Sequence, residues 1–421
     1  MRLRRGTPGL IRDLNRSAIL ALIGDEGRIA RVEIARRLSL SAATVTQVTR
    51  HLVDEGVIRE VDQAPSSGGR PPILLGLVGE AAQAVGAKIA ADHLAFVRST
   101  LGGDVVEQWT EPFDATSGID SLPERLAAAV DRSRPAEGRL LGLGLGVPGI
   151  VDGQGIVDAP VLGWRRLPLG PTLRKRLGIP VLADNDVNTL AVAERLYGRG
   201  RGVENFLTVT IGRGVGLGIV IGGDVYRGAR GGAGEFGHVT LQPGGPTCLC
   251  GNRGCLEALV GDPALVRDAR AAGLLPAGLE GGDAVARLRE LADAGDSQAR
   301  RLYAAAGSTL GRAVAGLVNT LSPELVLVSG EGVQAWSHIE TAFAEALHSE
   351  TFPPLRGVPV EVDPWDDAKW ARGAAALVLR ATFATPLYER GHEDSVRARL
   401  PRSRSRRSAG RESWVGEGVR G

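Results

Sequence analysis

Residues 234–257 read GEFGHVTLQPGGPTCLCGNRGCLE and contain every cysteine of the 421-residue chain. The three thiols fall within eight positions and one histidine precedes them, in the order His238, Cys248, Cys250 and Cys255. Three thiolates and an imidazole form a closed tetrahedral donor set for zinc, and the glycines between them let a short loop fold back on a metal. We therefore predict a structural Zn²⁺ site with these four ligands, because a full protein shell leaves no open coordination position.

The alternative interpretation is that the three thiols are unrelated buried cysteines. An odd number of cysteines cannot all pair within the chain, and reducing surroundings disfavour disulfides in any case. Because all three cysteines of the chain cluster beside a histidine, the pattern favours a metal site.

Two glutamates, Glu235 and Glu257, bracket the predicted metal loop. If His238 binds the metal through one ring nitrogen, its other nitrogen is left as an outward hydrogen-bond donor. Carboxylates and an imidazole N–H that converge on one pocket suit the vicinal hydroxyls of a sugar. The spacing alone also allows a plainer alternative, in which both glutamates only solvate a loop.

The composition is that of an ordinary globular protein, with 43% hydrophobic and 23% charged residues. The length allows two or three domains with sizeable cores. No apolar run approaches the ~18–20 residues that span a bilayer, so we expect no membrane partner. The first residues, MRLRRGTPGLIRDLNRS, lack the apolar stretch of a signal peptide, which predicts a cytoplasmic location.

Charge is distributed unevenly along the chain. Residues 1–79 hold 12 basic against 8 acidic side chains, residues 80–388 hold 29 against 35, and residues 389–421 hold 9 against 5. A basic first segment suits contact with nucleic acid. The last segment has few apolar residues, and we expect it to be a disordered basic tail.

The first 79 residues show the pattern of three short helices and a hairpin. The spacing of apolar residues predicts helices over 15–27, 30–40 and 41–56, the last with Ser41 as its N-cap. Two strand-like runs, VIREV and PILLGL, follow and are joined by the loop DQAPSSGGRPP. This order is that of a winged helix-turn-helix domain, in which the third helix reads base edges.

The polar face of the third predicted helix carries the side chains expected to contact double-stranded operator DNA. These are Ser41, Thr44, Gln47 and Arg50, with His51 beside them, and Arg70 in the glycine-containing loop would reach a minor groove or a phosphate. The alternative is a small helical bundle whose polar face is only solvated. The arginine in the loop favours DNA binding.

From about residue 80 the sequence alternates strand-like and helical segments, which is typical of an α/β fold. Strand patterns at VGAKIA, LAFVRST, LLGLGLGV, IPVLADND and ELVLVSG alternate with helical patterns such as VNTLAVAERLYG and KWARGAAALVLRATF. The order predicts two α/β lobes around a cleft over residues 80–388, which include the metal loop 238–255.

Several separate motifs of this body together resemble the ROK family (repressors, open reading frames and sugar kinases). They are GEFGH with CLCGNRGCLE, the strand end DNDVN at 184–188, GLGVPG and the glycine turn TIGRGVGLG. The leading winged helix and its SSGGRPP loop are similar to the regulator branch, so the resemblance covers about residues 10–385. It implies a two-lobed actin-like ATPase/hexokinase fold of ribonuclease H-like type, a homodimer or homotetramer, and a repressor of sugar uptake or catabolic genes.

Matching motifs also imply a set of binding residues. A monosaccharide or sugar-phosphate effector would be held by Asn185, Asp186, Glu235, His238 and Glu257, with the backbone at Gly149 closing the pocket. In the kinases of the family, the second acid of DND is the general base that deprotonates a sugar hydroxyl. Here that acid is Asp186, and a carboxylate within hydrogen-bond reach of a hydroxyl is chemically able to do this.

One stretch departs from the family's kinases. They begin this domain with D-x-G-G-T-K, whose glycines let backbone amides wrap the phosphates of ATP, whereas this chain reads GAKIAADHL. Lys88 stands in place of the acid, and Ala90, Ala91 and Asp92 replace Gly-Gly-Thr, so methyl groups and an added carboxylate would obstruct and repel polyphosphate. We therefore predict a sugar-responsive regulator with no catalytic residues, not an enzyme. The alternatives are an ATP-dependent sugar kinase with a fused DNA-binding head, and a constitutive DNA-binding protein whose body only dimerises.

Overall fold

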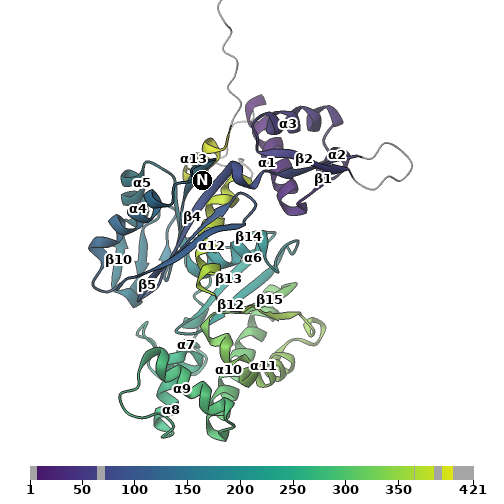
Figure 1. The fold of residues 1–421 in the computed structure, drawn as a ribbon. Helices are drawn as coiled ribbons and strands as arrows, with labels where there is room; N and C mark the ends of the chain where they lie inside the picture. The colour runs from purple at the N-terminus through teal and green to yellow at the C-terminus, as the bar shows by residue number, and fades with distance from the viewer. Residues whose placement is uncertain (1–6, 64–71, 365, 384–390, 402–421) are drawn as a thin grey trace, which may run out of the picture.

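The computed structural model describes residues 7–63, 72–364, 366–383 and 391–401. Figure 1 shows a small head and two larger lobes, with the head beside the first lobe and the second lobe at the opposite end of the molecule. Among the described residues, no helix is both long and apolar enough to cross a membrane.

The head is a winged helix-turn-helix domain built around one apolar core. Ile19, Ile23, Ile34, Val45 and Leu52 are fully buried in it. Its three short strands form an antiparallel sheet in the order β1-β3-β2. The elements are α1 (Pro8–Glu26), β1 (Ile29–Ala30), α2 (Arg31–Leu38), α3 (Ala42–Asp54), β2 (Ile58–Gln63) and β3 (Ile73–Leu77).

The first helix begins earlier than the apolar spacing predicts. It starts at Pro8 and not near residue 15, because the Thr7 hydroxyl accepts a hydrogen bond from the Leu10 N–H at 3.2 Å and proline suits the first helical position. The added turns include Leu10, which is buried.

The first lobe contains a five-stranded sheet in the order β11-β7-β4-β5-β6. Its first three strands along the chain pair antiparallel, β7 then pairs parallel to β4, and β11 pairs parallel to β7. A smaller sheet, β10-β9-β8, follows β7. The elements are β4 (Ala82–Ile89), β5 (His93–Thr100), β6 (Val105–Pro112), α4 (Leu122–Arg132), β7 (Arg139–Val147), β8 (Ile150–Val151), β9 (Val157–Ala159), β10 (Trp164–Leu167), α5 (Leu169–Leu177) and β11 (Val181–Asn185).

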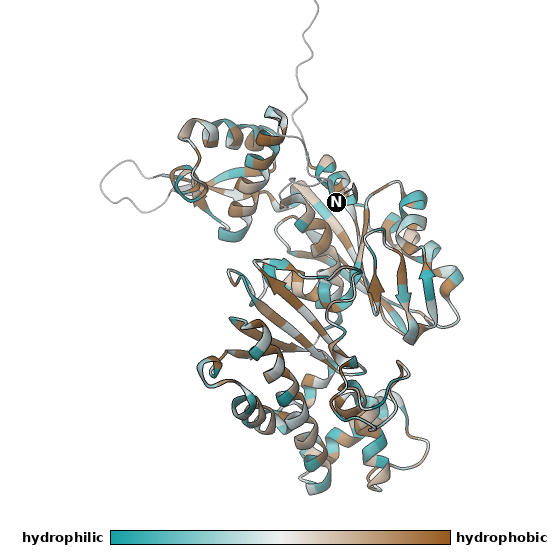
Figure 2. Cartoon of the chain, turned by 180° about the vertical axis from the view of Figure 1, so that it is seen from behind, coloured by the Kyte–Doolittle hydropathy of each residue, from teal (hydrophilic) through white to brown (hydrophobic). Residues whose placement is uncertain are grey.

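The second lobe repeats this topology. Its sheet has the order β14-β13-β12-β15-β16, with two antiparallel pairings followed by two parallel ones. Its central strands are hydrophobic along their length (Figure 2). Two copies of one mixed-sheet topology confirm the predicted two-lobed, ribonuclease H-like fold. The elements are β12 (Phe206–Ile211), β13 (Val215–Ile221), β14 (Asp224–Val225), α7 (Glu257–Val260), α8 (Asp262–Ala271), α9 (Gly281–Asp293), α10 (Ser297–Leu321), β15 (Leu325–Ser329), α11 (Trp336–Glu350) and β16 (Val360–Val362).

Two helices, α6 (Asp186–Tyr197) and α12 (Asp367–Phe383), pack against each other in the middle of the molecule (Figure 1). α6 also contacts β13 of the second lobe, whereas α12 contacts β4, β5 and β7 of the first. The contact between α12 and β7 requires glycine, because a Cβ at Gly144 would lie 1.7 Å from the Ala374 carbonyl oxygen. Helix and sheet therefore meet backbone to backbone.

The structure corrects the expectation that residues 389–421 form a disordered tail. A helix, α13 (Gly391–Arg399), forms there and packs against β7. Val396 of the helix is fully buried, and Leu400, just after the helix, is 2% exposed. The basic composition of the segment conceals these two buried apolar residues. The remainder of that segment lies outside the described residues.

Candidate functional site

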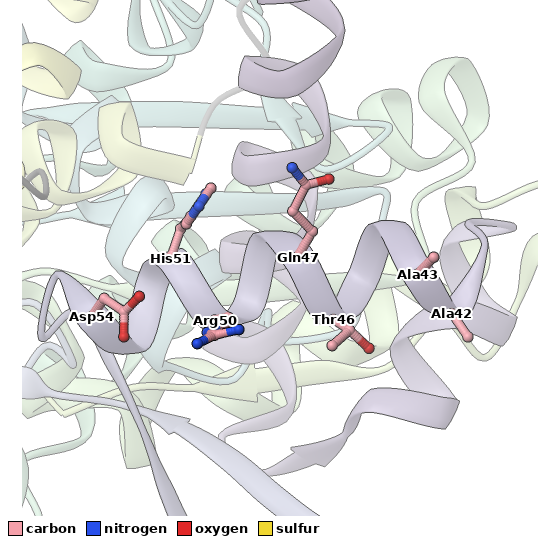
Figure 3. A pocket seen from close by; sticks show the side chains of 7 residues that line it. All are labelled: Ala42, Ala43, Thr46, Gln47, Arg50, His51 and Asp54. Carbon is pink, nitrogen blue, oxygen red and sulfur yellow. The ribbon is translucent and has the colours of Figure 1, made fainter. Parts of the chain in front are cut away.

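The exposed face of α3 forms a shallow hollow on the head (Figure 3). Ser41 caps this helix as predicted: its hydroxyl accepts a hydrogen bond from the Thr44 N–H at 3.1 Å and lies 2.8 Å from the Thr44 hydroxyl. Gln47 and Arg50 are exposed, and their side chains project from the helix. The hollow is lined by Ala42, Ala43, Thr46, Gln47, Arg50, His51 and Asp54.

Sequence reasoning identified only part of this face. The predicted Gln47 and Arg50 lie in the hollow, whereas the hydroxyls of Ser41 and Thr44 contact each other in the helix cap. Thr46 was missed, although its helical spacing from Arg50 places both on one side of α3. Arg70 falls outside the described residues.

Contacts behind the exposed face fix the position of α3. The Thr49 hydroxyl donates to the Val45 carbonyl at 2.8 Å and accepts from Nε of Arg31, the first residue of α2, at 3.1 Å. The same arginine pairs with Glu60 of β2 at 3.0 Å. A rigidly held helix that exposes a glutamine and an arginine suits the reading of base edges, since glutamine pairs with adenine and arginine with guanine in the major groove.

The four predicted metal ligands come together in the second lobe. Their donor atoms all lie within 4.8 Å of one another, with Nδ1 of His238 3.5 Å from Sγ of Cys248 and Sγ of Cys250 3.7 Å from Sγ of Cys255. Ordinary zinc bond lengths give tetrahedral edges of about 3.6 Å between nitrogen and sulfur and about 3.8 Å between sulfurs. The donor set therefore fits zinc in both chemistry and spacing.

Two glutamates lie beside this candidate metal site. The other ring nitrogen of His238, Nε2, is 3.8 Å from Oε2 of Glu235. Oε2 of Glu257 accepts a hydrogen bond from the Val215 N–H at 3.2 Å, and its Oε1 lies 3.9 Å from Sγ of Cys248. Burial raises the pKa of Glu235, and the charge of Glu257 adds to this. The structure therefore brings Glu235, His238 and Glu257 together, as the sequence predicted.

A second group of predicted residues lies where β11 meets α6. Asn185 caps α6, because its Oδ1 accepts from the Val187 N–H at 2.9 Å, while its Nδ2 donates to the Gly149 carbonyl at 3.0 Å. Gly149 has φ of 130°, and a Cβ there would lie 2.4 Å from the Asp158 carbonyl oxygen, so only glycine fits. Asp186 begins the helix, and burial raises the pKa of its carboxyl group.

The loop between β14 and Glu235 joins these two groups. Nε of Arg227 in this loop donates to Oδ2 of Asp184 at 2.5 Å, and Oδ1 of Asp184 accepts from the Asn185 N–H at 2.8 Å. Further along the loop, the backbone at Gly231 lies directly against the backbone of Val151 in the first lobe. A Cβ at Gly231 would lie 2.3 Å from the Val151 carbonyl oxygen. The loop that leads to Glu235 is thus tied to the first lobe. Sequence reasoning missed Arg227.

An ion pair connects the turn between β4 and β5 to the turn between β12 and β13. Asp92 of the first turn and Arg213 of the second lie 2.9 Å apart. His93 lies between two carboxylates, 3.3 Å from Asp367 and 2.8 Å from Asp92, and these raise its pKa. Lys88 pairs with Asp367 at 3.2 Å. The stretch that departs from the family's kinases therefore takes part in a network of ion pairs across both lobes.

Comparison with known proteins agrees with this architecture. The ROK family matches residues 89–381, and a winged helix-turn-helix DNA-binding family matches residues 12–59. A putative xylose repressor of Caldicellulosiruptor sp. (strain Rt8B.4) is 32% identical over 405 residues, which cover 91% of this chain and all of the relative.

Solved structures show the same fold. A ROK family transcriptional regulator described as a homologue of the Escherichia coli MLC protein superposes with a TM-score of 0.77 at 27% identity, covering 93% of this chain and 99% of that one. A ROK family glucokinase from Streptomyces griseus, solved with glucose and AMPPNP, has a TM-score of 0.60 at 28% identity and covers 70% of this chain and 98% of that one. Because the family matches well over half of its length, the chain belongs to the ROK family and carries a winged helix-turn-helix head.

Proposed function

We propose that this protein is a sugar-responsive transcriptional repressor that binds operator DNA through α3 and the wing of its head. The observation that carries this is the presence, in one chain, of an exposed α3 face and of a body in which Glu235 and Glu257 lie beside His238. The similarity to a putative xylose repressor over 91% of the chain supports the same conclusion. The genes it controls would be those for uptake or breakdown of its sugar.

The effector is a monosaccharide or a sugar phosphate. Glu235, Glu257 and Asp186 supply acceptors for sugar hydroxyls, while Nε2 of His238 and the Asn185 amide supply donors. Burial raises the pKa of the Asp186 carboxyl group, which favours hydrogen bonds from sugar hydroxyls in place of water.

Zinc has a structural role in this proposal. It would be held by His238, Cys248, Cys250 and Cys255 and would supply charge and rigidity without an open coordination position. With Nδ1 of His238 on the metal, Nε2 carries a proton and faces Glu235. The metal loop thereby holds one hydrogen-bond donor of the pocket in place.

The turn over residues 212–214 is surrounded by acidic groups, which supports a regulator and not a kinase. A Cβ at Gly212 would lie 2.3 Å from Oε2 of Glu331. Burial raises the pKa of Asp262 to about 6, and the charge of Glu331 adds to this. Together with Asp92, these carboxylates oppose the approach of a polyphosphate.

Two heads per assembly would be needed to hold a roughly palindromic operator, with each α3 in successive major grooves. We therefore propose a homodimer or a homotetramer as the functional form.

The second candidate function, an ATP-dependent sugar kinase, is favoured by one observation: Asp186 is a carboxyl group of raised pKa at the end of β11, as a general base would require.

A coupled assay for ADP release separates the two candidates. With Mg-ATP and a panel of D-xylose, D-glucose and N-acetylglucosamine, we expect no sugar-dependent turnover above that of the Asp186→Asn variant, because the stretch that departs from the family's kinases lacks their glycines and its Asp92 pairs with Arg213. Turnover that depends on sugar and disappears in Asp186→Asn would establish the kinase. A thermal-shift screen of the same sugars identifies a bound sugar independently of turnover.

A further inference from the structure

Helix α6 begins at the proposed sugar pocket, α12 begins beside Lys88, whose charge acts on Asp186 of α6, and both helices end at the head. α6 starts at Asp186, next to its cap Asn185, and α12 starts at Asp367, which pairs with Lys88. At the other end of α12, the ring of Phe383 packs against Gly24 of α1. A Cβ at Gly24 would lie 3.7 Å from this ring. The two helices pack along each other, so they connect the pocket to the head without a break.

Two arginines, Arg195 in the last turn of α6 and Arg201 just after it, contact the last turn of α1. Nη1 of Arg195 lies 3.7 Å from Oδ1 of Asp25. Arg201, just after α6, donates through Nη2 to the Gly24 carbonyl at 3.2 Å and also to the Asp25 carbonyl. The last carbonyls of a helix lack partners within the helix and lie at the negative end of its dipole, so guanidinium groups are favourable there.

These polar contacts differ in kind from the apolar packing around them. The head and the first lobe share one apolar core, which includes Leu20 of α1, Val378 of α12 and Val396 of α13. Apolar contacts are non-directional and tolerate small rotations. Hydrogen bonds from a guanidinium to two carbonyls depend on direction, so they fix the orientation of α1 relative to α6.

We propose that Arg195 and Arg201 form a clasp that transmits the state of the sugar pocket to the DNA-binding head. This inference rests on the proposed function. Sugar bound at Asn185 and Asp186 shifts the N-terminal end of α6, and a 12-residue helix carries that shift as a rod about 18 Å long. The clasp passes it to α1, which packs against α3.

The test compares the Arg195→Gln/Arg201→Gln double variant with an Arg199→Gln control. Arg199 lies between the two clasp residues, but its guanidinium pairs with Glu361 of the body at 2.5 Å and not with the head. Sugar affinity is measured by calorimetry with whichever sugar of the panel binds the wild type. Affinity for labelled DNA from upstream of the gene is measured by fluorescence anisotropy, with and without that sugar.

We expect the sugar to change the DNA affinity of the wild type and of Arg199→Gln at least about tenfold. In the double variant the ratio of DNA affinity without sugar to DNA affinity with sugar should be below about two. Its sugar affinity should stay within about twofold of the wild type, which also shows that the body is folded. A ratio in the double variant equal to that of the wild type would overturn the clasp and leave the proposed function intact. A wild-type ratio of one would overturn both.

Discussion

Replacing Cys250 with serine is expected to abolish zinc binding and to weaken sugar binding at least about tenfold, the usual scale for loss of a metal-site partner. Cys250 is exposed, so the substitution removes a ligand without opening a cavity in the core. Without the metal, His238 loses the partner that keeps its Nε2 toward Glu235, and the loop that contacts Glu257 is released. Metal content by mass spectrometry should fall from about one zinc per chain to a small fraction, and calorimetry should show the weaker sugar binding.

A matched control is available one residue away. Leu249 is 79% exposed and lies between two of the ligands, so Leu249→Ser changes the same loop without touching the metal. It should keep both zinc and sugar affinity. If Cys250→Ser loses its zinc but binds sugar as tightly as the wild type, the metal loop does not support the pocket.

The double substitution Gln47→Ala/Arg50→Ala is expected to weaken operator binding by about two orders of magnitude, since each base contact is worth about 1–3 kcal/mol. Both side chains lie in the hollow on α3 and point away from the core of the head. Their loss should therefore leave folding intact, and calorimetry should show unchanged sugar affinity. Anisotropy with labelled upstream DNA gives the DNA affinity.

Arg287→Ala provides the control for charge alone. Arg287 is exposed on α9 in the second lobe, and its removal lowers the net charge as Arg50→Ala does. DNA affinity should change less than about twofold. If Arg287→Ala weakened DNA binding as much as Gln47→Ala/Arg50→Ala does, general electrostatic attraction, and not contact by α3, would account for binding.

The sequence was sufficient for those parts of the molecule whose signals are local. All four predicted metal ligands fall between residues 238 and 255, and the structure brings their donor atoms within 4.8 Å of one another. Asn185 and Asp186 are adjacent, so a motif was enough to propose them together. The start of α1 also had a local signal, a threonine followed by proline, but the apolar spacing did not extend to it. The face of α3 was found in part, because Gln47 and Arg50 were predicted on it and Thr46 was not.

Contacts between distant segments left no such signal. The Arg227–Asp184 pair joins residues 43 positions apart, and the Arg213–Asp92 pair joins residues 121 positions apart. Asp184 and Asp92 lie in stretches that the sequence singles out, but nothing in those stretches indicates Arg227 or Arg213 as a partner, because an ion pair has no sequence pattern until the fold brings its ends together. The same holds for the contacts of Arg201 with α1, 176 and 177 positions away.

The most direct test of a sugar-responsive repressor is the affinity for DNA from upstream of its own gene, measured by anisotropy with and without a sugar that stabilises the protein. For the wild type, saturating sugar should weaken DNA binding at least about tenfold. In Glu235→Ala, which removes a carboxylate beside His238, the same sugar concentration should change it less than about twofold. Wild-type DNA affinity that stays constant at saturation with every sugar that binds would contradict the account.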